Sequence, residues 1–420
     1  MIAVFRAAVQ SWWESTMPRK ILFLCHPDHG HVIPTLAIVS ELASRGHDVS
    51  YLTAPSMRDI VARTGATVLT YDSHYRDADF TRLAEDPGYL MGVLLDESEA
   101  MLDTAVSELD GVEGVVYDTS VLYAGRILGR RWEVPSAQTI PFFASNEKFS
   151  YLNAMYNDPD GDGDRPAAEK PAELPEWVGK TMQRIGRLCH AHGVDTPPHE
   201  LWFEIPECSL VTIPREFQYE GDSFDGRFTF VGPCVGERDF LGEWTPPRGE
   251  DPVVLVSLGA VFNEHEDIFR ACVEAFRGMP WHAVLTVAEG TDPESLGALP
   301  DNVEVHRWVP HVTVLEHASL CVTHGGMGTV MEALRAGTPL VCVPTSALDR
   351  PTAWRVRELG LGTMLSPSDV TPDTLVDAIR SVLADRAAAE NAARMSKAVL
   401  DSGGAVRAAD RLEEHLVRRA

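Results

Sequence analysis

Short apolar runs alternate with helical segments along most of the chain. Runs of strand length occupy residues 20–24, 49–53, 114–117, 253–257, 319–323 and 340–344. Segments with helical spacing of apolar positions follow at 35–44 and 330–335. Buried strands joined by crossover helices form parallel sheets, so the pattern predicts an α/β protein.

The strands fall into two series, separated by residues 214–251, which are rich in glycine, proline and acidic residues. A chain of 420 residues is long enough for two α/β domains. We expect an N-terminal domain at 17–236 and a C-terminal domain at 237–402. Residues 1–16 precede Met17, a natural start, and are expected to lie outside the fold. A last helix at 403–420 begins at Gly403 and Gly404 and is a candidate to cross back to the first domain.

Composition narrows the possible partners. The net charge of −26 disfavours nucleic acid and anionic membranes. The seven cysteines are scattered and form no CxxC pair, which fits a reducing, cytoplasmic compartment. No run of eighteen apolar residues is present, so stable insertion into a membrane is not expected. The N-terminal stretch is not typical of a signal peptide.

A glycine-rich turn between a strand and a helix is the clearest candidate site. It reads His324-Gly325-Gly326-Met327-Gly328-Thr329. Backbone N–H groups are free at a helix N-terminus, where the helix dipole is positive, so such a turn can hold a phosphate or diphosphate. His324 and Thr329 can add side-chain donors. The turn lacks the lysine of a P-loop and the spacing of GxGxxG, so taken alone it is weak evidence.

The residues around this turn make it specific. Trp308 precedes it, Glu332 lies one helical turn into the following helix, and Asp349 follows the next strand. The stretch 308–350 resembles the donor-binding signature of family 1 nucleotide-sugar glycosyltransferases, which have two Rossmann-like domains facing across a cleft (the GT-B fold). It is most similar to bacterial macrolide and natural-product glycosyltransferases. The resemblance extends from about Arg19 to the C-terminus.

The resemblance implies a UDP- or dTDP-sugar as co-substrate, with neither a cofactor nor a metal. Trp308 and the adjoining Val309 are assigned to the uracil or thymine base, although Trp308 can also be read as a core residue. Glu332 would accept hydrogen bonds from ribose hydroxyls. Ser257 and Gly259, in the first turn of the second domain, would lie near the diphosphate.

The chain departs from the family pattern at three places. His311 stands where glutamine is usual after Trp-x-Pro, and Ala353 stands where asparagine is usual. Asp349, expected to accept from sugar hydroxyls, is followed by Arg350 instead of glutamine. A guanidinium cannot accept hydrogen bonds. Recognition of glucose through this side chain is therefore not expected, and the identity of the sugar stays open.

In the first half, His26, His29 and His31 follow the first strand, at the edge where open α/β sheets bind ligands. No carboxylate or cysteine completes a metal pattern around them. We expect Pro34 to begin the helix 35–44, so that the histidines lie on a loop. His31 reads as a helix cap from its position alone. The resemblance assigns it, as the histidine of GHxxP, to the general base that activates the acceptor.

Asp118 ends the strand 114–117 and can be a helix N-cap. The resemblance assigns it to holding the His31 tautomer, as in a Ser-His-Asp triad. Phe142 and Phe143 are candidates for an apolar acceptor pocket, or are core residues. Residues 158–169 match the letters of an EF-hand loop, but prolines inside the loop and after it make a mobile acidic loop the better interpretation.

The sequence therefore predicts an inverting, metal-independent glycosyltransferase that moves a sugar to a hydroxyl of a hydrophobic small molecule. Two alternatives remain: a nucleotide-sugar epimerase, which also has two Rossmann domains, and a non-catalytic sugar-nucleotide-binding partner.

Overall fold

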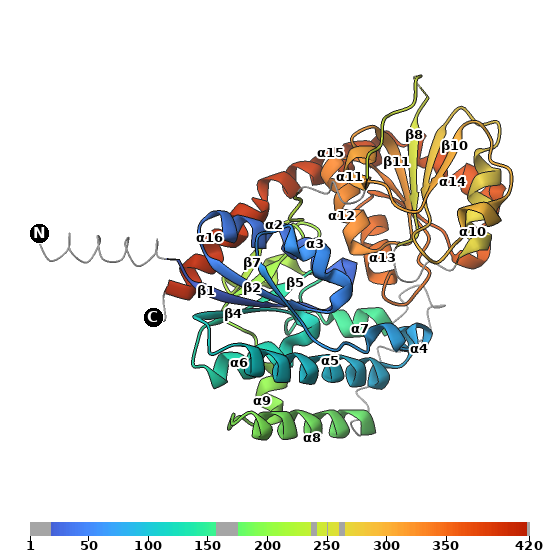
Figure 1. Ribbon diagram of the computed structural model, residues 1–420. Helices are drawn as coiled ribbons and strands as arrows, with labels where there is room; N and C mark the ends of the chain where they lie inside the picture. Colours follow the sequence, from blue (N-terminus) through green and yellow to red (C-terminus); the bar gives the residue numbers. More distant parts are fainter. Residues whose placement is uncertain (1–17, 157–174, 237–241, 250, 260–264, 418–420) are drawn as a thin grey trace, which may run out of the picture.

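The computed structural model describes residues 18–156, 175–236, 242–249, 251–259 and 265–417. They form two α/β domains, each built on a parallel sheet (Figure 1). The predicted domain boundary near residue 237 and the EF-hand-like segment 158–169 lie outside the described residues. Within the described residues, no helix combines the length and the apolar character needed to span a membrane.

The first sheet has seven strands in the order β3-β2-β1-β4-β5-β6-β7. The strands are β1 (Lys20–Leu24), β2 (Asp48–Thr53), β3 (Thr67–Thr70), β4 (Gly114–Asp118), β5 (Ser136–Ile140), β6 (Ser209–Val211) and β7 (Phe228–Phe230). The helices are α2 (His29–Ser44), α3 (Arg58–Ala62), α4 (Phe80–Glu85), α5 (Pro87–Glu108), α6 (Leu122–Arg131), α7 (Tyr151–Tyr156), α8 (Glu176–Ala191) and α9 (Pro198–Phe203). Short 3₁₀ turns are η1 (Pro55–Met57), η2 (Tyr75–Asp77), η3 (Thr119–Val121) and η4 (Gly221–Ser223).

The second sheet has six strands in the order β10-β9-β8-β11-β12-β13. The strands are β8 (Val253–Ser257), β9 (His282–Thr286), β10 (Val303–His306), β11 (Ala318–Thr323), β12 (Leu340–Cys342) and β13 (Gly362–Met364). The helices are α10 (Glu266–Phe276), α11 (His311–Leu315), α12 (Met327–Ala336), α13 (Arg350–Glu358), α14 (Pro372–Ala384), α15 (Arg386–Asp401) and α16 (Gly404–Val417). Short 3₁₀ turns are η6 (Pro293–Leu296) and η7 (Pro367–Asp369).

Both sheets have the Rossmann strand order, in which the first and fourth strands of each domain are neighbours. In the first domain Leu24 of β1 pairs with Tyr117 of β4, and in the second Ser257 of β8 pairs with Thr323 of β11. The connections from these strands diverge to opposite faces of the sheet and leave a crevice at the carboxyl ends. The two crevices therefore receive the loops that carry the predicted site residues.

The last helix belongs to the second half of the chain but packs on the first domain. Gly403 and Gly404 turn the chain after α15 with φ angles of 87° and 57°, and α16 then lies beside α2 (Figure 1). Leu412 and Leu416 are buried in the same apolar cluster as Ile21 of β1. The chain thus crosses between the domains twice, once before β8 and once before α16.

Candidate active site

The carboxyl ends of β1 and β4 bring His31 and Asp118 into direct contact. Nδ1 of His31 lies 2.9 Å from Oδ1 of Asp118. Because the two strands are adjacent, residues 87 positions apart in sequence meet at one edge of the sheet. In neutral His31 the Nδ1–H donates to the carboxylate, and the lone pair is then on Nε2.

His31 lies on a helix and not on a loop, which corrects the sequence prediction. α2 begins at His29, because the Asp28 side chain caps it by accepting from the Gly30 N–H at 2.7 Å. Pro34 is therefore inside the helix, not at its start, and has no N–H to donate to the Gly30 carbonyl. The cap fixes the first turn, and with it the direction of the His31 ring.

Asp118 makes the contacts that both interpretations of the sequence require. Its Oδ1 accepts from the Ser120 N–H at 2.8 Å, as the N-cap of η3, and also contacts His31. The carboxyl group is buried, and its Oδ2 has no hydrogen-bond partner among the described residues. Burial acts to raise the pKa of Asp118, but the imidazole of His31 outweighs it and holds this pKa below its ordinary value.

The same pair controls the protonation of His31. Burial acts to lower the pKa of the imidazole, whereas the Asp118 carboxylate raises it, and the net pKa lies above the ordinary value of 6.5. The pKa of His26 shifts in the opposite direction. Its ring lies edge-on to that of His31, with the ring centroids 5.3 Å apart. Burial and the neighbouring imidazole lower the pKa of His26 to about 4, so this ring is neutral near pH 7.

The three histidines of this segment point to different neighbours. His26 packs on Tyr75, with ring centroids 4.1 Å apart, while His29 reaches across the cleft and stacks on Trp308 at 5.6 Å. They do not converge on one point. Among the described residues there is no group of three or more His, Cys, Asp or Glu side chains that could hold a metal ion.

Phe142 and Phe143 have different surroundings. Phe142 meets His31 edge-on at 5.8 Å and stacks on Tyr151 at 4.6 Å, so it lines the space in front of the imidazole. Phe143 is 1% exposed and packs against Phe217. Its side chain is therefore part of the core.

The glycine-rich turn of the second domain has the geometry of an anion site. β11 ends at Thr323, and α12 begins after Gly326, which has extended backbone and offers no side chain as a cap. The first N–H groups of α12 are thus free of a side-chain acceptor from the cap, and the positive end of the dipole faces the turn. Gly328 is exposed and Thr329 is half-buried at this end of the helix.

The His324 ring fills a slot between two glycines. A Cβ on Gly326 would lie 2.3 Å from its Nε2, and a Cβ on Gly259 would lie 2.8 Å from the same atom. Gly259 follows β8 with a φ of 92°, a conformation that favours glycine. Ser257, at the end of β8, is buried. The turns after β8 and β11 are therefore packed together around the imidazole.

Trp308 is 38% exposed and stacks on His29 of the first domain, so it is not a core tryptophan. Its indole N–H donates to Glu289 at 3.3 Å. Val309 is buried, which leaves only its backbone available to a ligand. Glu332 is nearly buried, with its Oε2 3.6 Å from Nδ1 of His311. The residue that departs from the family pattern at position 311 thus lies beside the carboxylate expected to bind ribose.

Asp349 and Arg350 occupy different environments although they are adjacent. The Asp349 carboxylate is buried, accepts from the Ser346 N–H at 2.9 Å, and lies 3.7 Å from Nε2 of His324. Arg350 is exposed in the first turn of α13. Ala353, the third departure from the family pattern, is buried near Gly325.

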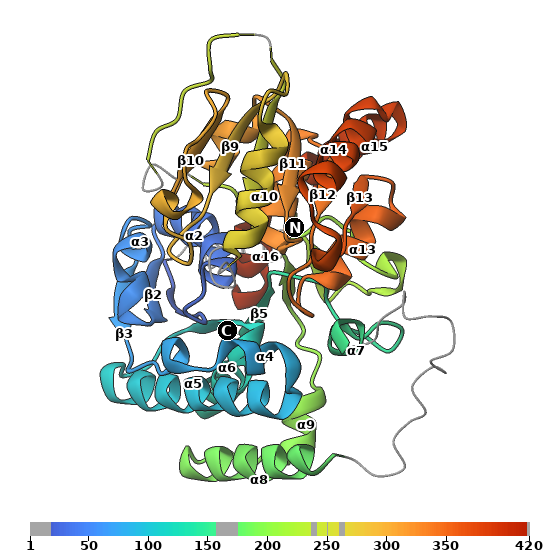
Figure 2. The ribbon, with the colours of Figure 1, turned by 90° about the vertical axis from the view of Figure 1, so that its right-hand side faces the viewer.

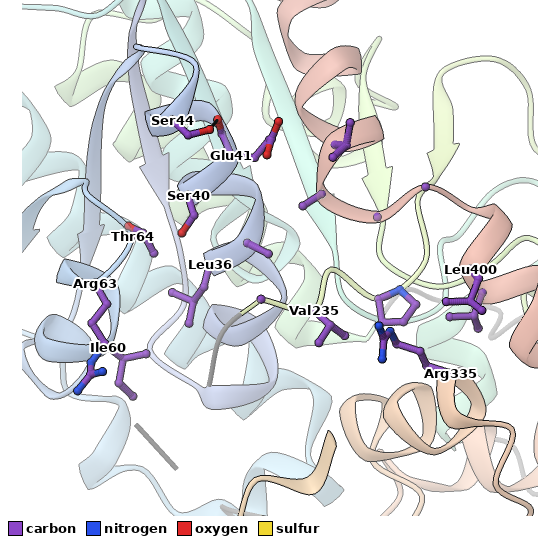
Figure 3. A pocket seen from close by; sticks show the side chains of 18 residues that line it. Leu36, Ser40, Glu41, Ser44, Ile60, Arg63, Thr64, Val235, Arg335 and Leu400 are labelled. Carbon is purple, nitrogen blue, oxygen red and sulfur yellow. Dashed lines mark hydrogen bonds between the residues drawn. The ribbon is translucent and has the colours of Figure 1, made fainter. Parts of the chain in front are cut away.

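A cavity of about 890 Å³ lies away from these groups. Figure 3 shows its lining by Leu36, Ser40 and Glu41 of α2 and by Arg335 of α12, next to Val235 of the connection between the domains. None of the predicted site residues lines this cavity. We therefore place the site at the carboxyl edges of the two sheets.

Three residues at the site were missed by sequence reasoning. His29 stacks on Trp308, Tyr75 donates to the Asp28 cap at 3.3 Å, and Tyr151 packs on Phe142. His29 carried a signal, since it lies in the same short segment as His31. Tyr75 and Tyr151 lie in segments without periodic pattern, and nothing in the sequence distinguishes them from other aromatic residues.

Comparison with known proteins agrees with this geometry. Residues 279–414 match the family described as erythromycin biosynthesis protein CIII-like, C-terminal domain. The demethyllactenocin mycarosyltransferase of Streptomyces fradiae is 37% identical over 94% of this chain and 86% of its own length. The NDP-glycosyltransferase YjiC of Bacillus licheniformis is 32% identical over 93% of this chain and 96% of its own. The crystal structure of the calicheamicin glycosyltransferase CalG4 superposes with a TM-score of 0.82 at 42% identity, covering 96% of this chain and 100% of that one.

The two Rossmann-like domains form a GT-B fold. The chain belongs to the family 1 natural-product glycosyltransferases. It is a glycosyltransferase.

Proposed function

We propose that this enzyme transfers a sugar from a UDP- or dTDP-sugar to a hydroxyl of a hydrophobic small molecule, such as a macrolide or polyketide, with inversion and without a metal. One observation carries the proposal. The His31–Asp118 pair and the glycine-rich turn lie on facing domains, and the His29–Trp308 contact shows that these two faces meet. The acceptor would lie against Phe142, and the donor against the second domain.

The acceptor half of the reaction needs a base. His31 accepts the hydroxyl proton at Nε2, and the imidazolium that forms is stabilised by Asp118 at 2.9 Å. The acceptor oxygen then attacks the anomeric carbon, while the bond from that carbon to the diphosphate oxygen breaks. Attack in line with the leaving group inverts the configuration. The nucleoside diphosphate leaves with the electron pair of the broken bond.

The donor half needs positive charge where the diphosphate departs. The N-terminus of α12 supplies N–H groups and the helix dipole, and His324 adds a side-chain donor. Trp308 offers an exposed aromatic face to the base, Glu332 accepts from the ribose, and Asp349 accepts from sugar hydroxyls. Ser257, Gly259 and Thr329 line the diphosphate region. Arg350 is exposed at the sugar end, where its cation favours an anionic group.

Replacing the base tests the acceptor half of the proposal. We expect His31→Ala to reduce kcat for a hydroxyl acceptor by roughly 10²- to 10⁴-fold, the usual contribution of a positioned base. The variant should bind nucleotide as the wild type does, because the donor groups lie on the other domain. Initial rates of nucleoside diphosphate release measure the loss.

An acceptor that needs no base provides the control. An aromatic thiol already ionised at the assay pH should lose much less rate in His31→Ala than the matched phenol. Full activity of the variant with an ordinary alcohol acceptor would refute the assignment of His31.

A further inference from the structure

The two domains are tied together by an arginine that no part of the reaction above uses. Arg355 lies in the middle of α13, in the second domain, and its side chain is 13% exposed. Its Nε donates to the Phe217 carbonyl at 2.9 Å, and its Nη2 donates to the Glu216 and Gln218 carbonyls at 3.2 and 3.1 Å. One guanidinium therefore binds three consecutive carbonyls of the first domain.

A second contact reinforces this attachment. Tyr219 follows the three carbonyls, and its hydroxyl donates to the Pro351 carbonyl of α13 at 2.9 Å. The guanidinium of Arg355 lies 4.8 Å from the centre of the same ring. Figure 2 shows α13 close to α7 on this side of the molecule. Side chains from both domains therefore connect the segment 216–219 with α13.

On the first domain, the attached segment supports the acceptor side of the cleft. The Gln218 side chain is buried and binds Ala144 twice, accepting from its N–H at 2.9 Å and donating to its carbonyl at 3.1 Å. Ala144 begins the loop that follows Phe142 and leads to Tyr151. These two aromatic rings stack on each other, and Phe142 contacts His31.

On the second domain, α13 begins at the sugar-binding residues. The Asp349 carboxylate immediately precedes the helix and lies 3.7 Å from His324 of the glycine-rich turn. Tyr151 adds a direct link, because its hydroxyl donates to the Leu348 carbonyl at 3.4 Å. A continuous series of contacts therefore connects the proposed base with the proposed sugar site. Of the residues in this series that bond across the domain boundary, Arg355 makes three hydrogen bonds, whereas Tyr219 and Tyr151 make one each.

We propose that Arg355 is a positioning residue that aligns the acceptor hydroxyl with the anomeric carbon, and so selects sugar transfer over hydrolysis of the donor. This inference rests on the proposed function. Without the hydrogen bonds of Arg355 to the first domain, the donor stays bound by the second domain while the acceptor is held away from it. Water then attacks the anomeric carbon, the bond to the diphosphate oxygen breaks, and free sugar, nucleoside diphosphate and a proton are released.

Arg355 can have this effect because the rate of sugar transfer depends steeply on the positions of the reacting atoms. Reacting atoms must be held near 3 Å apart and in line, and a misplacement of about 1 Å costs on the order of 100-fold in rate. Two separately folded domains do not meet that requirement without contacts that fix their relative position. The planar guanidinium of Arg355, bound to three carbonyls, restricts both the distance and the angle between the domains. A lysine ammonium on a flexible side chain restricts them less.

The test measures the ratio of transfer to hydrolysis of a nucleotide sugar at saturating acceptor. Arg355→Ala should lower this ratio by about tenfold or more, and Arg355→Lys should fall between Ala and wild type. Nucleotide affinity should stay within about twofold of wild type, since the base and phosphate groups belong to one domain. Tyr219→Phe removes one hydroxyl and should lower the ratio in the same direction, by a smaller factor.

Arg277→Ala is the matched control. Arg277 follows α10, forms an exposed ion pair with Glu274, and lies outside the contacts between the domains. Its removal should leave the ratio unchanged. A purely structural role of Arg355 would lower the melting temperature while the ratio stayed at the wild-type value, and that result would overturn the inference. If Arg355→Ala does not fold, Arg355→Lys and Tyr219→Phe decide by the same ratio.

Failure of this inference is distinguishable from failure of the proposed function. Wild-type enzyme that transfers sugar, with an unchanged ratio in the variants, refutes only the role of Arg355. Wild-type enzyme that transfers to no hydroxyl acceptor refutes the function on which this role rests.

Discussion

At the scale of single residues, the pair of His31 and Asp118 stabilises opposite charges on its two members. Asp118 is buried and His31 is half-buried, which disfavours ionisation of either one alone. Together they favour the imidazolium and the carboxylate, so the pKa of His31 is raised and that of Asp118 is lowered. In the proposed mechanism the imidazolium forms as the acceptor loses its proton, and Asp118 would stabilise the product of that step.

This predicts a specific pH dependence. In the proposed mechanism neutral His31 is the base, so kcat/KM should rise with pH, and the midpoint of this rise should lie above 6.5 because the pKa of His31 is raised. In Asp118→Asn the negative charge in contact with His31 is gone, and only the weaker effect of the Asp28 carboxylate still opposes burial, so the midpoint should move to lower pH. The plateau should fall by about 100-fold or more, because the carboxylate no longer fixes the tautomer.

Rate profiles of wild type and Asp118→Asn over the same pH range check this. Ser40→Ala is the control, because Ser40 is exposed on α2, nine residues beyond His31, and the substitution leaves the carboxylate in place. Its midpoint should equal that of the wild type. An unchanged midpoint in Asp118→Asn would contradict the assignment of the acidic limb to His31.

The sequence was sufficient to select candidate residues, but it did not predict which of them lie at the site and which lie in the core. It named His31 and Asp118 together, and the structure places them in contact. It treated Phe142 and Phe143 alike, whereas adjacent side chains here point one to the imidazole and one to the core. Tyr151 has no sequence signal, because its relevance comes from packing that only the folded chain creates.

At the scale of elements, the proposed donor site lies where the turns after β8 and β11 pack closely together. Gly259→Ala should push the His324 ring out of its slot, because the added Cβ would lie 2.8 Å from two ring atoms. We expect the dissociation constant for UDP or dTDP to rise about tenfold, equivalent to about 1.4 kcal/mol. Nucleotide titration by calorimetry measures the change.

Gly278→Ala is matched in backbone cost. Gly278 has a φ of 70°, close to the 92° of Gly259, but a Cβ there would meet no atom within 4 Å. Both variants should lose about 1–2 kcal/mol of stability from the left-handed backbone, and only Gly259→Ala should lose affinity. Equal affinities in the two variants would show that His324 does not contribute to nucleotide binding.

Sequence patterns predicted which elements form more reliably than where each element begins. Apolar strands and the glycine turn were recognised because their signals are local. The start of α2 was placed six residues too late, because Pro34 is typical of a first turn and the Asp28 cap was not recognised. A single side chain-to-backbone hydrogen bond at Asp28 moved the boundary and brought the histidines onto the helix.

At the scale of the whole molecule, the C-terminal helix completes the core of the first domain. Leu412 is fully buried in the cluster that includes Ile21, and Leu416 packs so closely on Gly114 that a Cβ there would lie 2.3 Å from it. We expect Leu412→Ala to lower the free energy of unfolding by about 2–5 kcal/mol through the cavity it leaves. Chemical denaturation with a first-domain fluorescence probe measures this loss.

Val406→Ala on the same helix is the control, because Val406 is 54% exposed. Its cost should stay within about 0.5 kcal/mol. A small effect of Leu412→Ala would mean that α16 contributes little to the first domain in solution.

The sequence by itself determined the α/β class, the two series of strands, and the glycine-rich turn, because each depends on residues close together in the chain. The resemblance to a known family supplied the pairing of His31 with Asp118 across 87 positions. Only the tertiary structure decided which residues face the cleft, how His324 is held between Gly259 and Gly326, and that Arg355 joins the domains. Those relations arise between segments far apart in sequence, whose packing fixes distances that no local pattern encodes.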